Sequence, residues 1–184
     1  QRHRAPRGKE SLAVSDLPPT TFLLRSNRVV TTKGTRAANI LVEDGLIRGV
    51  YPPDAELDES LADISVEDVG DLVVSPGVID AHVHVNDPGT DWEGFDTATK
   101  AAAAGGVTTI VDMPLNSTPV TTNVDTFAKK RIAAVGHCWV DVGFYGGLVQ
   151  GNLSALPSLC KIGVLGVKAF LCHSGLDEFP NALE

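Results

Sequence analysis

Cysteine is scarce in this chain, and its few cysteines lack the spacing of a metal site. The 184 residues include Cys138, Cys160 and Cys172, an odd number with no Cys-x-x-Cys pattern. A disulfide-rich secreted domain would carry a denser, even set, and a cysteine-based zinc site would carry close pairs. The sequence predicts neither of these. It favours a reducing compartment, and we expect a cytoplasmic location, with the peroxisome and the endomembrane system as alternatives.

Aromatic residues, positive charge and long apolar runs are also limited. Aromatic residues make up 5% of the chain, and the formal net charge is −8. A nucleic-acid-binding domain is expected to carry a basic stripe, and a membrane span needs about 20 consecutive apolar residues. We therefore expect no nucleic-acid partner and no membrane partner. A small polar substrate fits this composition better.

Three segments of the chain differ in their pattern. Residues 1–20 begin with several basic residues and no apolar run follows, which predicts a disordered tail. Residues 21–72 hold short β-like runs, two of them joined by Asp44-Gly45, a strong hairpin signal, and we predict a small β-sandwich-type domain with an acidic loop over 54–68. Residues 73–184 alternate between strand-like and helix-like segments, as βαβ units do.

The alternating segment predicts four strands and three intervening helices. The helices are expected over 92–104, where Gly105-Gly106 would end the first, over 123–135, where Asn123 would cap the second, and over 153–162. The strands are expected at the run that ends near residue 84 and over 107–113, 139–144 and 164–171.

His82 and His84 form the most informative pattern in the sequence. Side chains alternate along a strand, so these two imidazoles point the same way while Val83 faces the packing behind them. Neutral imidazole is a common ligand of metal ions, zinc included. Asp87-Pro88-Gly89 predicts a turn just beyond, which puts the histidines near the carboxyl end of their strand, where α/β barrels hold their active sites.

Lys168 interrupts the last apolar run of the chain, Gly166-Val167-Lys168-Ala169-Phe170. One interpretation is a strand-end lysine whose ammonium reaches solvent or an acidic partner. The other is that desolvation and nearby cations lower its pKa, so that the free amine becomes carboxylated and offers oxygen ligands to metal. Asn116, in the loop after the second barrel strand, is either a turn residue or a contact to the substrate's polar edge.

Several blocks between residues 72 and 180 resemble the cyclic amidohydrolases and, within them, the allantoinases. The histidine pair is shared across that superfamily, whereas two further blocks look specifically like allantoinase. Those two blocks are Trp92-Glu93-Gly94-Phe95 and Asp112-Met113-Pro114-Leu115-Asn116. The resemblance implies an α/β fold, namely the first half of a metal-dependent (β/α)8 TIM barrel preceded by the small β domain.

The same resemblance implies the chemistry of the site. His82 and His84 would bind the more buried of two divalent ions, most simply zinc, and Lys168, as N6-carboxylysine formed with CO2, would bridge both. A metal-bound water would then attack the ring amide of (S)-allantoin and yield allantoate. The family takes further histidines and a catalytic aspartate from later strands, which this sequence does not contain, so we expect an amino-terminal portion that is inactive alone and oligomeric, as a dimer or tetramer, at full length.

Three alternatives stay open at the level of the sequence. A dihydroorotase is expected to carry an arginine shortly after the histidine pair, and position 86 is asparagine. A hydantoinase or dihydropyrimidinase would share the metal site but is less expected to show the Trp-Glu-Gly-Phe block. A truncated, non-catalytic relative that acts as an interaction partner would bind no stoichiometric metal.

Overall fold

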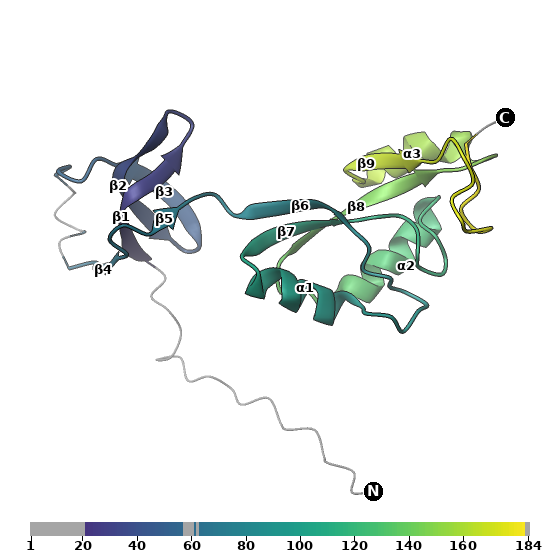
Figure 1. Ribbon diagram of the computed structural model, residues 1–184, viewed down its shortest axis with the longest axis horizontal. Helices are drawn as coiled ribbons and strands as arrows, with labels where there is room; N and C mark the ends of the chain where they lie inside the picture. The colour runs from purple at the N-terminus through teal and green to yellow at the C-terminus, as the bar shows by residue number, and fades with distance from the viewer. Residues whose placement is uncertain (1–20, 57–60, 62, 183–184) are drawn as a thin grey trace, which may run out of the picture. The chain divides into compact units, whose positions relative to one another are not determined.

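The protein folds as two compact units, Gln1–Pro76 and Gly77–Glu184, each with its own sheet (Figure 1). The computed structural model describes residues 21–56, 61 and 63–182. The tail predicted over residues 1–20 lies outside the described residues. Within the described ranges, none of the helices has the length and apolar character needed to cross a membrane.

The first unit is a five-stranded sheet built around one long strand, β1. Its strands are β1 (Thr21–Thr31), β2 (Gly34–Glu43), β3 (Leu46–Tyr51), β4 (Ser65–Asp68) and β5 (Val73–Val74). β2 and β3 form the predicted hairpin, and both Asp44 and Gly45 have positive φ, at 51° and 75°, as a tight two-residue hairpin turn requires. The pairing of β1 with β2 shifts register between Ser26 and Val29, and the first half of β1 pairs with β4 and its second half with β5.

Two features of this unit differ from the sequence-based expectation. The acidic stretch predicted as a loop over 54–68 ends in strand β4, which pairs in parallel with β1. All four residues of β4 are exposed, so backbone pairing forms the strand without the alternating apolar pattern that would reveal it. β5 also pairs with β1, and the first unit therefore runs to Pro76 rather than to residue 72.

The second unit is a parallel sheet in the order β6-β7-β8-β9, with a helix between successive pairs from β6 onward. This matches the four strands and three helices expected from the sequence. The elements are β6 (Val78–Val83), α1 (Phe95–Ala104), β7 (Val107–Asp112), α2 (Val124–Ala134), β8 (Asp141–Leu148), the short helix η3 (Leu153–Ala155), α3 (Leu156–Ile162) and β9 (Gly166–Ala169).

Local chemistry explains where the helices begin. α1 starts at Phe95 rather than at the predicted residue 92, because Gly94 has a φ of 92° and leaves the helical region. α2 starts where predicted, since the Asn123 side chain accepts from the Thr126 backbone N–H at 3.0 Å and Thr126 reciprocates in a capping box.

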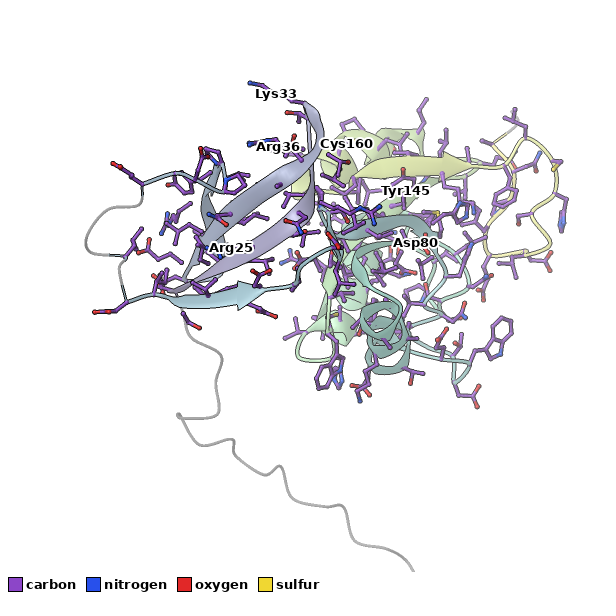
Figure 2. All side chains as sticks on the ribbon, turned by 60° about the vertical axis from the view of Figure 1, so that its left-hand side comes forward. Arg25, Lys33, Arg36, Asp80, Tyr145 and Cys160 are labelled. Atoms are coloured by element: carbon purple, nitrogen blue, oxygen red, sulfur yellow. The ribbon has the colours of Figure 1, made fainter. Side chains whose placement is uncertain are left out.

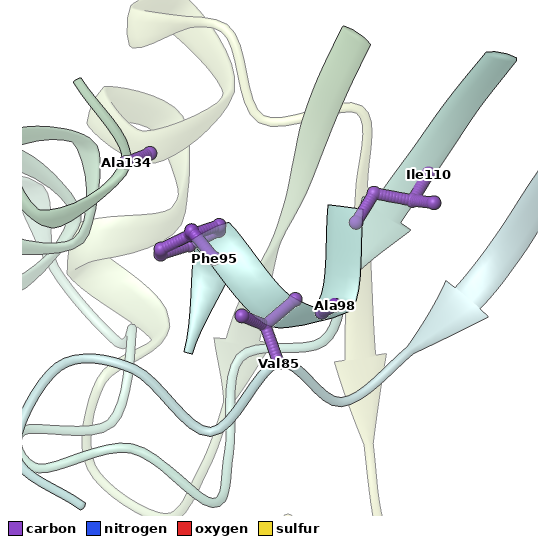
Figure 3. Close-up of a cluster of buried hydrophobic side chains, with 5 residues drawn as sticks. All are labelled: Val85, Phe95, Ala98, Ile110 and Ala134. Atoms are coloured by element: carbon purple, nitrogen blue, oxygen red, sulfur yellow. The ribbon is translucent and has the colours of Figure 1, made fainter. Parts of the chain in front are cut away.

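A cluster of buried apolar side chains fixes α1 and α2 against one face of the sheet (Figures 1 and 3). Phe95 is 1% exposed and lies edge-to-face with Phe144 of β8, with the ring centroids 6.2 Å apart. Val83 of β6 packs against the same cluster. The buried members are Val85, Phe95, Ala98, Ile110 and Ala134.

A second cluster closes the carboxyl ends of the strands. It contains Met113 and Leu115 after β7 together with Phe179, which is fully buried in the segment that follows β9. Gly147 of β8 makes this approach possible, because a β-carbon at that position would come within 2.7 Å of Cζ of the Phe179 ring. The segment after Lys168 is thereby held against β8.

Replacement of Phe95 should separate packing from surface roles within the Trp-Glu-Gly-Phe block. Phe95→Ala is expected to cost about 3–5 kcal/mol of unfolding free energy, because it leaves a cavity between α1 and the sheet. Trp92→Ala is the matched control: Trp92 is 74% exposed, and its loss should cost within about 0.5 kcal/mol. Urea unfolding followed by circular dichroism measures both, and equal losses would contradict this assignment.

Candidate functional site

The two candidate metal-binding histidines are His82, on β6, and His84, the first residue after that strand. Because Val83 packs toward α1 and α2, the alternation of side chains places His82 and His84 on the other face. Asp80, labelled in Figure 2, precedes them on β6, and its carboxylate accepts from the His82 backbone N–H at 3.1 Å. Asp80 thus supports the backbone of the histidine segment.

Lys168 meets His82 across the curled sheet. The Lys168 Nζ and the His82 Nε2 lie 3.2 Å apart, although the two residues are 86 positions apart and occupy the edge strands β9 and β6. The ammonium also lies 5.2 Å from the centroid of the Phe170 ring. The Lys168 amine thus lies beside one of the two candidate histidine ligands.

His84 is half-buried beside Asn116. The Asn116 Nδ2 lies 3.2 Å from the His84 Nδ1, and the His82 and His84 rings have centroids 5.5 Å apart. Asn116 has a positive φ of 64°, a left-handed conformation that asparagine tolerates well in turns. The loop after β7 therefore turns at Asn116 and brings its amide to the histidine pair, so both roles considered for this residue are compatible with its position.

The surroundings of His84 and Lys168 lower the pKa of each side chain. Desolvation lowers the pKa of His84 below its ordinary value, and the positive charge of Lys168 lowers it further. Desolvation also lowers the pKa of Lys168. Both shifts favour the neutral forms, which are the forms that bind metal ions or react with CO2.

The donors gathered here suit part of a metal site. Among residues 21–56, 61 and 63–182, no three His, Cys, Asp or Glu side chains lie close enough together to hold a metal ion. The cluster offers two imidazoles and one amine instead, and an amine becomes an oxygen donor only as a carbamate. His82, His84 and carboxylated Lys168 therefore fit one side of a metal centre that needs further ligands.

The structure reveals a buried ion pair that the sequence analysis missed. Lys130 of α2 donates to the Asp112 carboxylate, with Nζ and Oδ2 2.6 Å apart, and both side chains are essentially inaccessible to solvent. Burial raises the pKa of Asp112, and the Lys130 charge opposes that rise. Lys130 lies on the buried side of α2 with Phe127 and Ala134. These positions are three and four residues apart, the spacing of one helix face, and a lysine on an otherwise apolar face is the signal of a buried charge.

The remaining histidines of the second unit lie apart from this cluster. His173 follows β9, and its ring Nδ1 accepts from the Gly175 backbone N–H at 3.0 Å while its side chain is 69% exposed. His137 is exposed and precedes β8. Cys172, also exposed, belongs to the same segment as His173. All three residues are therefore surface residues outside the cluster.

A titration of the metal-free protein tests the His84 environment. We expect the His84 imidazole to titrate below about 6.5, the ordinary value for histidine. As the pH falls below about 6.5, His84 binds fewer protons in the folded state than in the unfolded state. Its contribution to stability is therefore present above about 6.5 and is lost on acidification. Proton NMR of the imidazole measures the midpoint.

The same titration has a matched pair of variants. Lys168→Met should raise the His84 midpoint toward the ordinary value by removing a nearby positive charge. Lys161→Met removes a lysine from the last turn of α3 and should leave the midpoint where it is. A wild-type midpoint at or above about 6.5 would contradict the desolvated environment assigned to His84.

Sequence relatives of this chain are allantoinases from bacteria and plants. The chain is 55% identical over 161 residues to an allantoinase from Streptomyces avermitilis, an alignment that covers 87% of this chain and 36% of the relative. It is 46% identical over 168 residues to an allantoinase from Arabidopsis thaliana, covering 89% of this chain and 33% of that protein. The chain thus spans about a third of the length of the curated relatives it matches.

Solved structures give the same architecture from more distant relatives. The L-hydantoinase (dihydropyrimidinase) from Arthrobacter aurescens superposes with a TM-score of 0.76 at 31% identity, over 90% of this chain and 36% of that one. A D-hydantoinase superposes with a TM-score of 0.70 at 27% identity, over 88% and 35% of the two chains. These likenesses confirm the predicted fold class, a β domain followed by the first half of a (β/α)8 barrel.

One family covers the part of the chain that carries the candidate site. Residues 73–172 match the amidohydrolase family. That range includes His82, His84, Asn116 and Lys168, together with the buried pair Asp112 and Lys130. The match covers more than half of the chain and agrees with the relatives and the solved structures. This chain belongs to the amidohydrolase family.

Proposed function

We propose that the protein to which this chain belongs hydrolyses the ring amide of (S)-allantoin to allantoate. The single observation that carries the proposal is the 3.2 Å approach of Lys168 Nζ to His82 Nε2, which gathers the predicted ligands of β6 and β9. Supporting it, the curated relatives at 45–55% identity over most of the chain are named allantoinases. Members of this family generally depend on a binuclear metal centre and act on small molecules.

His82, His84 and Lys168 would hold the metal ions, for which zinc is the simplest choice. Two bound dications would supply a water of lowered pKa and would polarise the carbonyl of the ring amide. The chain's own residues keep the site ready for that chemistry. The lowered pKa of His84 keeps its imidazole neutral, and the Asp80 carboxylate holds the His82 backbone.

Lys168 would contribute after carboxylation. Its neutral Nζ attacks the carbon of CO2, a new N–C bond forms, and the nitrogen gives up one proton, so that a carbamate anion replaces the amine. His82 Nε2 lies 3.2 Å from Nζ, and in the tautomer that leaves Nε2 unprotonated it would be placed to accept that proton. The lowered pKa of Lys168 supports the step, because only the unprotonated amine reacts.

Asn116 would contact the substrate as well as His84. Its Nδ2 faces the His84 ring at 3.2 Å, and its Oδ1 would accept an N–H of the hydantoin-like ring of allantoin. Such a contact would discriminate ring substrates by their polar edge. For the whole protein we also propose assembly as a dimer or tetramer and a cytoplasmic location, with the peroxisome and the endomembrane system as alternatives.

A second candidate function is the hydrolysis of hydantoins or dihydropyrimidines. The observation that favours it is the superposition on hydantoinase structures. Dihydroorotase activity has less support, since Asn86 stands where an arginine would be expected to bind the substrate carboxylate. A non-catalytic role as an interaction partner is the remaining alternative.

Metal removal tests the proposed activity in the complete gene product. We expect hydrolysis of (S)-allantoin that is lost after treatment with a chelator and restored by Zn²⁺, because the dications supply the nucleophile. Hydantoin, dihydrouracil and dihydroorotate should be poorer substrates. If the enzyme prefers one of these rings, that ring and not allantoin is its substrate. A protein with neither activity nor stoichiometric metal would support the non-catalytic role.

Chemical rescue tests the role of Lys168. Loss of a residue that supports a metal ligand typically lowers activity by about 10- to 100-fold. Lys168→Ala should lower kcat by more than that, because it removes a ligand itself. A short carboxylic acid such as propionate should restore part of the activity by supplying the missing carboxylate oxygens. Lys161→Ala on α3 is the matched control and should leave activity unchanged. Full activity of Lys168→Ala without any added acid would refute the carbamate role.

A further inference from the structure

The buried pair Asp112–Lys130 lies on the opposite side of the sheet from the histidines and yet is connected to them. Asp112 ends β7, and its side chain points toward α2, where Lys130 holds Oδ2 at 2.6 Å. Its other oxygen, Oδ1, accepts from the Val85 backbone N–H at 2.9 Å. Since both carboxylate oxygens already have hydrogen-bond partners, Asp112 is placed to act through the backbone and not as a metal ligand.

The two peptide groups that flank His84 are both hydrogen-bonded to the end of β7 and the residue after it. The Val83 carbonyl, in the peptide before His84, accepts from the Met113 N–H at 2.8 Å. The Val85 N–H, in the peptide after His84, donates to Asp112. The planes of these two peptides determine φ and ψ of His84, and these angles determine where its Cβ and imidazole point.

Lys130 contacts both Asp112 and Met113, the two residues that bond to the peptides on either side of His84. Besides the Asp112 carboxylate, its Nζ donates to the Met113 carbonyl at 3.1 Å. The Lys130 side chain is 1% exposed, and its ammonium therefore contacts, away from solvent, the two consecutive residues that bond to the backbone around His84. β6 has already ended at Val83 and Asn86 has a positive φ of 65°, so regular strand pairing does not support this segment further on.

We propose that Asp112 and Lys130 are positioning residues for the metal site, which aim the His84 imidazole by fixing the backbone on either side of it. This inference rests on the proposed function, because it assumes that His84 binds metal. A purely structural pair would tie α2 to β7 and affect folding alone. A positioning pair also sets the metal affinity of the folded protein.

The test must separate the hydrogen bond to Val85 from the burial of charge. Removing only Lys130 leaves an unpaired buried carboxylate and risks unfolding. Two double variants avoid this, since each removes both charges and keeps similar volumes. In Asp112→Asn with Lys130→Met the side-chain oxygen that accepts from Val85 is retained. In Asp112→Leu with Lys130→Met that acceptor is lost.

The measurement is the Zn²⁺ dissociation constant of the metal-free complete gene product, by competition with a chromophoric chelator, with circular dichroism and thermal melting to establish the folded fraction. We expect the leucine double variant to bind Zn²⁺ about 10- to 100-fold more weakly than the asparagine double variant, the range typical for outer partners of metal ligands. The surface pair Lys100–Asp96 is the matched control, because its Nζ–Oδ2 distance is also 2.6 Å and both side chains are half exposed. Asp96→Leu with Lys100→Met should leave the affinity unchanged.

Equal affinities of the two Asp112 double variants would overturn the positioning role while leaving the proposed function intact. An equal loss in the Lys100–Asp96 control would overturn it too, since the effect would then come from the removal of any ion pair. A wild-type protein that binds no Zn²⁺ would overturn the proposed function and this inference with it.

Discussion

The curvature of the parallel sheet is the constraint on which the candidate site depends. His82 and Lys168 lie on β6 and β9, the two edges of a four-stranded sheet, and strands are spaced by about 4.8 Å. Three such intervals in a flat sheet would hold the two backbones about 14 Å apart. Their side-chain nitrogens nevertheless come within 3.2 Å, because the sheet curls and both residues occupy its inner face.

Packing on the outer face supports that curvature. α1 and α2 lie along one side of the sheet, and the cluster around Phe95, Ile110 and Val85 fills the space between (Figure 3). The same side carries the Asp112–Lys130 pair. The sheet therefore separates a helix-facing layer, whose side chains set the geometry, from an inner face that carries nucleophilic nitrogens. Changes in the outer layer reach the inner face through the backbone of β6 and β7.

Much of this arrangement follows from local patterns in the sequence. The alternation of side chains places His82 and His84 on one face, and Asn123 caps α2 where a capping residue is expected. β4 escaped prediction because its exposed residues carry no periodic signal and its pairing with β1 spans more than forty positions of sequence. The partner of Lys130 escaped prediction too, because a single sequence does not show that Asp112, 18 positions earlier, lies beside it in the fold. Local patterns do not reveal which residues pair when they are distant in sequence.

The separation of His82 from Lys168 has a consequence for synthesis on the ribosome. The histidines emerge before α1, whereas the lysine emerges only with β9, after the strands β7 and β8 and the helices α1, α2 and α3. A nascent chain that has exposed β6 but not β9 holds two imidazoles and no amine to join them. The lysine completes the cluster only after most of the described half-barrel has been translated, so the order of translation itself delays assembly of the site until its scaffold is in place.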